Sequence, residues 1–150
     1  MTMTRSNRVL TLVLLLILVR PVLAKAQTMS DFVGTWYSET KREGVVDGKP
    51  YDMRRELLQN RSDSTKTNTN RYYKGDTLVA EIVATYSWGV QDGLFWTECR
   101  TVLSEGQASL CSTRYEYDIV SINPRELRYT SRSSGTTYSS LRVKDDFRLP

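Results

Sequence analysis

The sequence predicts an all-β domain of eight antiparallel strands, arranged either as an up-and-down barrel or as a sandwich. Short segments rich in Thr, Tyr, Val and Trp alternate with clusters of turn-forming residues, and long helical periodicity is absent. The segments are evenly spaced and their connections are short, which is typical of both architectures. The expected strands lie at 33–40, 53–60, 65–73, 78–90, 94–102, 109–120, 126–132 and 136–143.

The first 26 residues have the pattern of a secretory signal peptide. A short positive start is followed by an apolar run at 9–19 and then by Ala24-Lys25-Ala26, an Ala-x-Ala step. The apolar run is too short for a membrane anchor, which needs about 20 apolar residues. We therefore expect cleavage after Ala26, with Ala24 as the second choice, and a mature domain at 27–150. The mature protein is expected to be periplasmic or secreted, with no stable membrane span.

The composition excludes several classes of function. The chain has no histidine, which excludes Ser–His–Asp and Cys–His nucleophiles as well as His-ligated metals. Four of the 21 basic residues lie in the acid-free first 26 residues, so 17 basic and 17 acidic residues remain in the mature chain. Nucleic-acid binding needs clustered excess positive charge, which this balance does not provide. We expect no enzyme activity, no metal and no cofactor.

The two cysteines, Cys99 and Cys111, are expected to form one structural disulfide. Export places them in an oxidising compartment, where disulfides persist. A redox-active pair is the alternative, but the spacing is not Cys-x-x-Cys.

Two turns predict which residues share a face of the sheet. A two-residue turn at Asp92-Gly93 pairs Trp88 with Thr97 and Tyr86 with Cys99, and it places Trp96 opposite Gly89. An aromatic ring over a cross-strand glycine shields that backbone. A hairpin centred on Glu105 would then pair Cys99 with Cys111, Thr97 with Thr113 and Phe95 with Tyr115. The uncharged face shared by both hairpins is Ala84, Tyr86, Trp88, Val90, Phe95, Thr97, Cys99, Thr101, Cys111, Thr113, Tyr115, Tyr117 and Ile119.

The remaining strands are less well specified. A turn at Ser134-Gly135 pairs Ser131 with Tyr138, Tyr129 with Ser140 and Leu127 with Arg142, which gives a Tyr-rich face with one arginine. The segment 65–73 is polar on both faces, so its register is weakly determined. The basic pairs Lys41-Arg42 and Arg54-Arg55 are balanced by nearby glutamates, and we interpret them as solvated.

The uncharged face is expected to point inward, where it either forms a core or lines a ligand pocket. Eight strands enclose a space that is packed or holds one small ligand. Aromatic residues at strand spacing commonly form a core. However, the abundance of Tyr and Thr in place of Val, Leu and Ile favours a cavity with polar groups. The candidate ligand-binding residues are Tyr86, Trp88, Phe95, Thr97, Thr113, Tyr115, Tyr117, Tyr129 and Tyr138.

The order of motifs resembles that of exported bacterial proteins with a lipocalin-like (calycin-type) domain. Gly34-Thr35-Trp36 on the opening strand is similar to the lipocalin Gly-x-Trp signature, and Ser87–Leu94 and Tyr117–Ile122 follow in the same order. The resemblance implies an eight-stranded antiparallel up-and-down barrel. It also implies that Gly34 and Trp36 close one end with a basic residue of the last strand, here Arg142. Arg128 and Arg132 are the alternatives for that role.

These expectations lead to two main functional hypotheses. The first is an exported barrel that binds a small hydrophobic or amphipathic ligand inside. The second is a non-catalytic envelope interaction, assembly or inhibitor protein with a solid core, which would act through loops such as Arg42–Pro50 and Arg61–Ser64. An enzyme with a Glu–Tyr or Arg site inside the barrel is a third, weaker alternative. The sequence does not indicate the oligomeric state.

Overall fold

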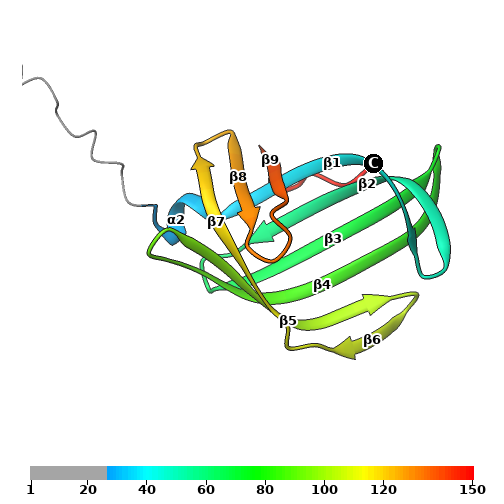
Figure 1. The fold of residues 1–150 in the computed structure, drawn as a ribbon, viewed down its shortest axis with the longest axis horizontal. Coiled ribbons are helices and arrows are strands. Elements are labelled where there is room, and N and C mark those ends of the chain that lie inside the picture. Colours follow the sequence, from blue (N-terminus) through cyan, green and yellow to red (C-terminus); the bar gives the residue numbers. More distant parts are fainter. Residues whose placement is uncertain (1–26) are drawn as a thin grey trace, which may run out of the picture.

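The computed structural model describes residues 27–150, and the predicted signal peptide lies outside them. The described part contains one short helix and an antiparallel sheet whose strands follow each other along the chain (Figure 1). The elements are α2 (Met29–Phe32), β1 (Gly34–Val46), β2 (Lys49–Asn60), β3 (Thr65–Lys74), β4 (Thr77–Gln91), β5 (Leu94–Ser104), β6 (Gln107–Leu110), β7 (Arg114–Ile122), β8 (Glu126–Ser131) and β9 (Thr137–Val143).

The sheet closes into an eight-stranded barrel, which confirms the predicted fold class. Each strand of the ring pairs with its neighbours, and β1 pairs with β9 to complete the circle. Strand β6 lies outside the ring because it pairs with β5 alone among the described strands. Strands β1–β4 run well beyond the short β7–β9, so the barrel has a long wall on one side and a short wall on the other (Figure 1).

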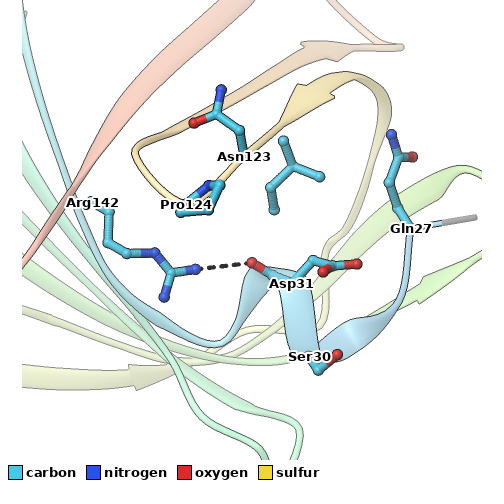
Figure 2. Close-up of a pocket in the computed structure, with 7 residues that line it drawn as sticks. Gln27, Ser30, Asp31, Asn123, Pro124 and Arg142 are labelled. Atoms are coloured by element: carbon cyan, nitrogen blue, oxygen red, sulfur yellow. Dashed lines mark hydrogen bonds between the residues drawn. The ribbon is translucent and has the colours of Figure 1, made fainter. Parts of the chain in front are cut away.

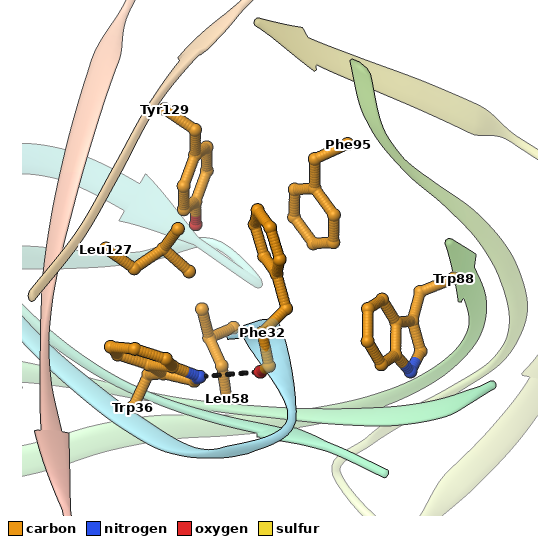
Figure 3. Close-up of a cluster of buried hydrophobic side chains, with 7 residues drawn as sticks. All are labelled: Phe32, Trp36, Leu58, Trp88, Phe95, Leu127 and Tyr129. Atoms are coloured by element: carbon orange, nitrogen blue, oxygen red, sulfur yellow. Dashed lines mark hydrogen bonds between the residues drawn. The ribbon is translucent and has the colours of Figure 1, made fainter. Parts of the chain in front are cut away.

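One end of the barrel is packed solid. The helix α2 was not predicted, and it inserts Phe32 among six other buried side chains, shown in Figure 3. The Phe32 carbonyl oxygen accepts hydrogen bonds from Trp36 Nε1 at 2.9 Å and from Asn60 Nδ2 at 3.1 Å. The cluster consists of Phe32, Trp36, Leu58, Trp88, Phe95, Leu127 and Tyr129.

Trp36 and Arg142 face each other at the seam between β1 and β9. The guanidinium carbon of Arg142 lies 4.3 Å from the centre of the Trp36 ring, and Arg142 Nη2 donates to the Asp31 carbonyl oxygen at 3.0 Å. A Cβ atom on Gly34 would lie 2.8 Å from Arg142 Nη1, and the φ of Gly34 is +133°, so a glycine is required there. Neither alternative takes this role. Arg132 forms ion pairs with Glu116 and Asp118, and Arg128 is exposed opposite Ser139.

The register predicted from the Asp92-Gly93 turn is confirmed as far as Cys99. Trp88 pairs with Thr97, Gly89 with Trp96 and Tyr86 with Cys99. Beyond this point a bulge shifts the register between Thr85 and Tyr86, so that Thr101 pairs with Thr85 rather than following Cys99 on the inner face. The prediction that Thr101 faces inward is therefore wrong, because an extra residue in one strand reverses the alternation.

The predicted strand 109–120 is two strands, β6 and β7, separated at 111–113. The disulfide between Cys99 and Cys111 is present, with the Cα atoms 5.4 Å apart. The pairing of Thr97 with Thr113 and of Phe95 with Tyr115 is wrong by two residues, since Thr97 pairs with Tyr115 and Phe95 with Tyr117. The break in the strand at the disulfide accounts for the two extra residues. Because side chains alternate with a period of two, a shift by two residues leaves Tyr115 and Tyr117 on the predicted face.

The last hairpin is also shifted by two residues. Tyr129 pairs with Tyr138 and Leu127 with Ser140, rather than Tyr129 with Ser140 and Leu127 with Arg142. The cause is a longer turn that is centred one residue earlier than Ser134-Gly135: the Ser131 amide donates to the Thr136 carbonyl oxygen at 2.9 Å, so the turn encloses residues 132–135. Side-chain alternation is again preserved.

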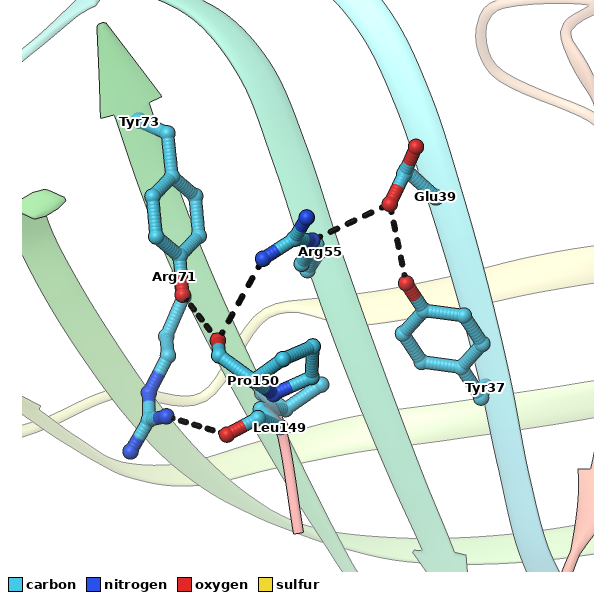
Figure 4. A network of polar contacts seen from close by, with 7 residues as sticks. All are labelled: Tyr37, Glu39, Arg55, Arg71, Tyr73, Leu149 and Pro150. Atoms are coloured by element: carbon cyan, nitrogen blue, oxygen red, sulfur yellow. Dashed lines mark hydrogen bonds and ion pairs between the residues drawn. The ribbon is translucent and has the colours of Figure 1, made fainter. Parts of the chain in front are cut away.

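The C-terminal segment after β9 is irregular but lies along the outer face of β1–β3 (Figure 4). Arg71 Nη1 donates to the Leu149 carbonyl oxygen at 2.6 Å, and the Tyr73 hydroxyl donates to the Pro150 carbonyl oxygen. Phe147 packs against Tyr37 with ring centres 5.3 Å apart. The packing of the C-terminal segment against the barrel buries Tyr73 and Leu149 on its outer face.

The contact of Trp96 with Gly89 gives a stability prediction. A Cβ atom on Gly89 would lie 2.7 Å from Trp96 Cζ2, so Gly89→Ala must displace the indole. We expect Gly89→Ala to lower the free energy of unfolding by about 1–2 kcal/mol in the wild-type background. In a Trp96→Ala background the same change should cost close to nothing, because the added methyl group then meets no ring. Urea unfolding of the four proteins measures this coupling, and equal costs in both backgrounds would contradict it.

Candidate functional site

The barrel interior above the solid end is a polar chamber of about 200 Å³. Its wall combines charged and amide side chains from β2 and β3 with tyrosines from β4, β7, β8 and β9. The lining residues are Arg54, Glu56, Lys66, Asn68, Asn70, Tyr86, Thr97, Tyr115, Tyr117, Tyr129 and Tyr138. We refer to this cavity as the chamber.

Strand alternation places the polar wall. Three residues of β3 lie on one face: Lys66, Asn68 and Asn70. Their partners on the neighbouring strand β4 are Tyr86, Ala84 and Ile82, respectively. The same face continues onto β2, where Asn68 pairs with Leu58 of the buried cluster. Because side chains on one face repeat every two residues, the inner position of Leu58 carries Glu56 and Arg54 inward as well.

Glu56 is the organising group of the polar wall. It is 8% exposed, and its carboxylate accepts hydrogen bonds from Asn68 Nδ2 at 2.7 Å and from Ser38 Oγ at 3.2 Å. Arg54 Nη2 lies 3.8 Å from the same carboxylate. Burial lowers the pKa of Arg54, but Glu56 and the surrounding tyrosines outweigh this and raise it overall. The charge of Glu56 is thus compensated by neighbours on three strands.

Lys66 is buried in the same wall without such compensation. The residue is 5% exposed, and within the described chain its ammonium makes no hydrogen bond or ion pair. Instead, Nζ lies 5.2 Å from the ring centre of Tyr86 and 5.3 Å from that of Phe95. Burial lowers the pKa of Lys66 to about 8, and the opposing attraction of Glu56 only partly offsets this. The ammonium is therefore held largely by aromatic faces.

Three of the tyrosines, Tyr117, Tyr129 and Tyr138, form a connected aromatic wall across the barrel from Lys66. Tyr117 packs edge-on against Tyr129 with ring centres 5.0 Å apart, and Tyr129 stacks on Tyr138 at 5.4 Å. Burial raises the pKa of Tyr86 to about 12 and also raises those of Tyr117 and Tyr129, so the hydroxyl groups stay protonated at neutral pH. In the described chain the hydroxyl groups of Tyr86, Tyr129 and Tyr138 have no protein hydrogen-bond partner. They are free to bind a guest.

A second cavity of about 320 Å³ forms the mouth of the chamber, where β9 begins and β1 continues past it. It shares Arg54 and Tyr138 with the chamber, so these two side chains lie between the two spaces. Above the mouth, the end of the β1–β2 hairpin contacts the turn between β5 and β6. Lys49 Nζ lies 2.7 Å from Glu105 Oε1, and Ser104 Oγ donates to Asp47 Oδ2 at 2.6 Å. The remaining mouth residues are Ser38, Glu39, Thr40, Arg42, Tyr51, Thr136, Thr137 and Ser139.

The structure places the predicted ligand-binding residues in three settings. Trp88 and Phe95 are fully buried in the solid end, and Trp88 Nε1 donates to the Thr65 carbonyl oxygen at 2.9 Å, which makes its role structural. Thr113 is exposed in the break between β6 and β7, away from the chamber. The residues that do line the chamber are Tyr86, Thr97, Tyr115, Tyr117, Tyr129 and Tyr138.

Sequence reasoning missed the polar half of the chamber. Arg54 was interpreted as solvated, but its side chain lies between the chamber and the mouth. The sequence does not mark Glu56, Lys66, Asn68 or Asn70 as lining residues, although Lys66 and Glu56 are buried. The sequence signal that could reveal Glu56 is its position two residues before Leu58 on β2, which places both side chains on one face. Using this signal requires knowing that Leu58 faces inward.

A larger but more open depression lies outside the barrel at the solid end. Figure 2 shows it between α2 and the loop that joins β7 to β8, with a volume of about 480 Å³. Arg142 borders it, but this side chain is already engaged by Trp36 and the Asp31 carbonyl group. The one basic side chain of the depression is therefore already occupied within the chain. Within residues 27–150, no three His, Cys, Asp or Glu side chains gather in a way that could hold a metal ion.

Comparisons with known proteins do not assign the chain. No protein family model matches it, and no curated protein matches it either. The closed eight-stranded barrel is consistent with a lipocalin-like fold. The architecture is therefore the only support for the resemblance noted in the sequence. No helix of the described part is long and apolar enough to cross a membrane.

The burial of Lys66 predicts a specific pH dependence of stability. The pKa of Lys66 is about 8 in the folded protein and 10.5 as a reference, so the unfolded chain binds more protons between these values. Burying the ammonium therefore lowers the free energy of unfolding by its full amount below about pH 8, and this loss becomes smaller as the pH rises from about 8 to 10.5. Relative to Lys66→Met, the wild type should gain about 2 kcal/mol between about pH 7.5 and about pH 9.5.

Urea unfolding of both proteins at several pH values measures this difference. The chamber tyrosines are common to both proteins, so their own titration cancels. Lys74→Met, on the exposed end of the same strand, is the matched control and should show no such trend. A constant difference between wild type and Lys66→Met across the range would show that the ammonium is not desolvated.

Proposed function

We propose that the protein is an exported, non-catalytic, lipocalin-like carrier that binds one small amphipathic molecule inside the barrel. One observation carries the proposal: a closed barrel leaves a chamber walled by tyrosines on one side and by charged and amide groups on the other. A protein that needed only a core would fill this space with aliphatic side chains.

The lining narrows the hydrophobic or amphipathic ligand expected from the sequence to an amphipathic one. The apolar part of the interior is already packed by the seven residues of the solid end. The chamber offers ring faces and hydrogen-bonding groups, including the buried Oδ1 of Asn70, which has no partner in the described chain. A buried acceptor of this kind favours a guest that carries a donor.

The size of the chamber favours a guest with a single ring. An apolar cavity of roughly 150 Å³ holds benzene, and the chamber measures about 200 Å³. Substituents on the ring would extend past Arg54 and Tyr138 into the mouth. An export compartment fits the disulfide, which persists under oxidising conditions.

Native mass spectrometry of the protein purified from its export compartment tests the proposal. We expect a bound small molecule that is released on unfolding, and the same molecule should raise the Tm of the stripped protein by linkage. Tyr115→Ala removes a chamber ring that is 40% exposed, so it should weaken binding about tenfold with little loss of stability.

Tyr37→Ala is the matched control, because Tyr37 lies on the outer face against Phe147. It should leave binding unchanged. A protein that carries no small molecule and gains no thermal stability from a library of single-ring amphipathic compounds would overturn the proposal and move the function to the outer surface.

A further inference from the structure

We infer that Lys66 is the anchor for a carboxylate, so that the chamber selects a small ring-bearing acid over neutral molecules of the same shape. The inference rests on the proposed function and adds the chemical class of its ligand. It follows from the charges of the wall, from the surroundings of the ammonium and from the position of Lys66 in the barrel.

The charges of the wall are unbalanced. Arg54 and Lys66 are basic and Glu56 is the one acid among the residues that line the chamber. Glu56 is already engaged by Arg54, Ser38 and Asn68. One positive charge therefore remains, and it is located on Lys66.

The surroundings of Lys66 are suited to an anion that is not part of the protein. Taking an ammonium group out of water is costly unless it is paired. The Tyr86 and Phe95 rings provide only cation–π attraction, at 5.2 and 5.3 Å. An incoming carboxylate would supply the missing charge and two hydrogen-bond acceptors in a site shielded from solvent. A neutral amide would leave the ammonium uncompensated.

The position of Lys66 also fixes the orientation of the guest. Lys66 pairs with Tyr86 and contacts Phe95 of the solid end, so its ammonium lies at the inner end of the chamber. Arg54 and Tyr138 lie between the chamber and the mouth. A bound acid would place its carboxylate against Lys66, its ring along the tyrosine wall, and its remaining substituents toward the mouth.

Matched pairs of probes test the inference. Benzoate, phenylacetate and hydrocinnamate are titrated beside their primary amides into the full chain at neutral pH, by calorimetry or by chemical-shift changes. For the best-fitting pair, we expect the wild type to bind the carboxylate about tenfold or more tightly than the amide. Lys66→Met should remove this preference while changing the amide affinity little, and Lys74→Met should retain it.

The pH dependence supplies a second readout. Carboxylate binding holds the proton on Lys66, so the affinity of the wild type should fall as the pH rises above about 8, while the amide affinity stays level. In Lys66→Met both affinities should be level. A merely structural lysine would not produce this difference between the two probes.

The outcomes separate the two proposals. Equal affinity for acid and amide in the wild type, or a preference that survives in Lys66→Met, overturns the carboxylate anchor and leaves the carrier proposal intact. Tighter binding of the amides has the same meaning. If neither series binds and the purified protein carries no small molecule, the carrier proposal fails and the anchor fails with it.

Discussion

The seam between β1 and β9 is the constraint on which the barrel depends. The two strands join through three residue pairs, and Trp36 opposite Arg142 is the middle one. At this pair the guanidinium covers the indole, and it also donates to the carbonyl oxygen of Asp31 in α2. The same helix presents the Phe32 carbonyl oxygen to Trp36. One group of contacts thus closes the ring, docks the helix and seals the solid end, which leaves the polar chamber as the part of the interior open to a guest.

Bulges set the distance over which the fold could be predicted. The Asp92-Gly93 turn contains two residues, so counting outward from it gives the correct partners as far as Tyr86 and Cys99. The shift beyond this pair moves Thr101 to the other face, and a similar shift on β4 leaves Leu78 48% exposed at the end of an otherwise inward face. Nothing in the composition of these strands marks the extra residue. Register inference is therefore reliable from a correctly placed two-residue turn to the next bulge and not beyond it.

The same physics explains which half of the chamber could be predicted. The registers of Tyr117 and Tyr138 were wrong by two residues, which is an even number, so both side chains still face inward. For Glu56 the sequence predicts no register at all, because the basic pairs and glutamates around it are interpreted as solvated. Charged residues are also exposed by default, and their inward position depends on partners from other strands. Lys66 has no local signal at all in a strand that is polar on both faces.

The buried charges of the polar wall are not explained by the needs of the fold alone. A lysine at an inner position costs stability at neutral pH, and an apolar side chain of the same length would remove that cost. Other features stabilise the fold, namely the disulfide at the break between β6 and β7 and the C-terminal segment, which buries its own Leu149 together with Tyr73. Sites that a fold maintains at the expense of its own stability are commonly those that bind or react. Because Glu56 is already paired and Lys66 is not, the unbalanced charge is the one that the proposed carboxylate ligand would neutralise.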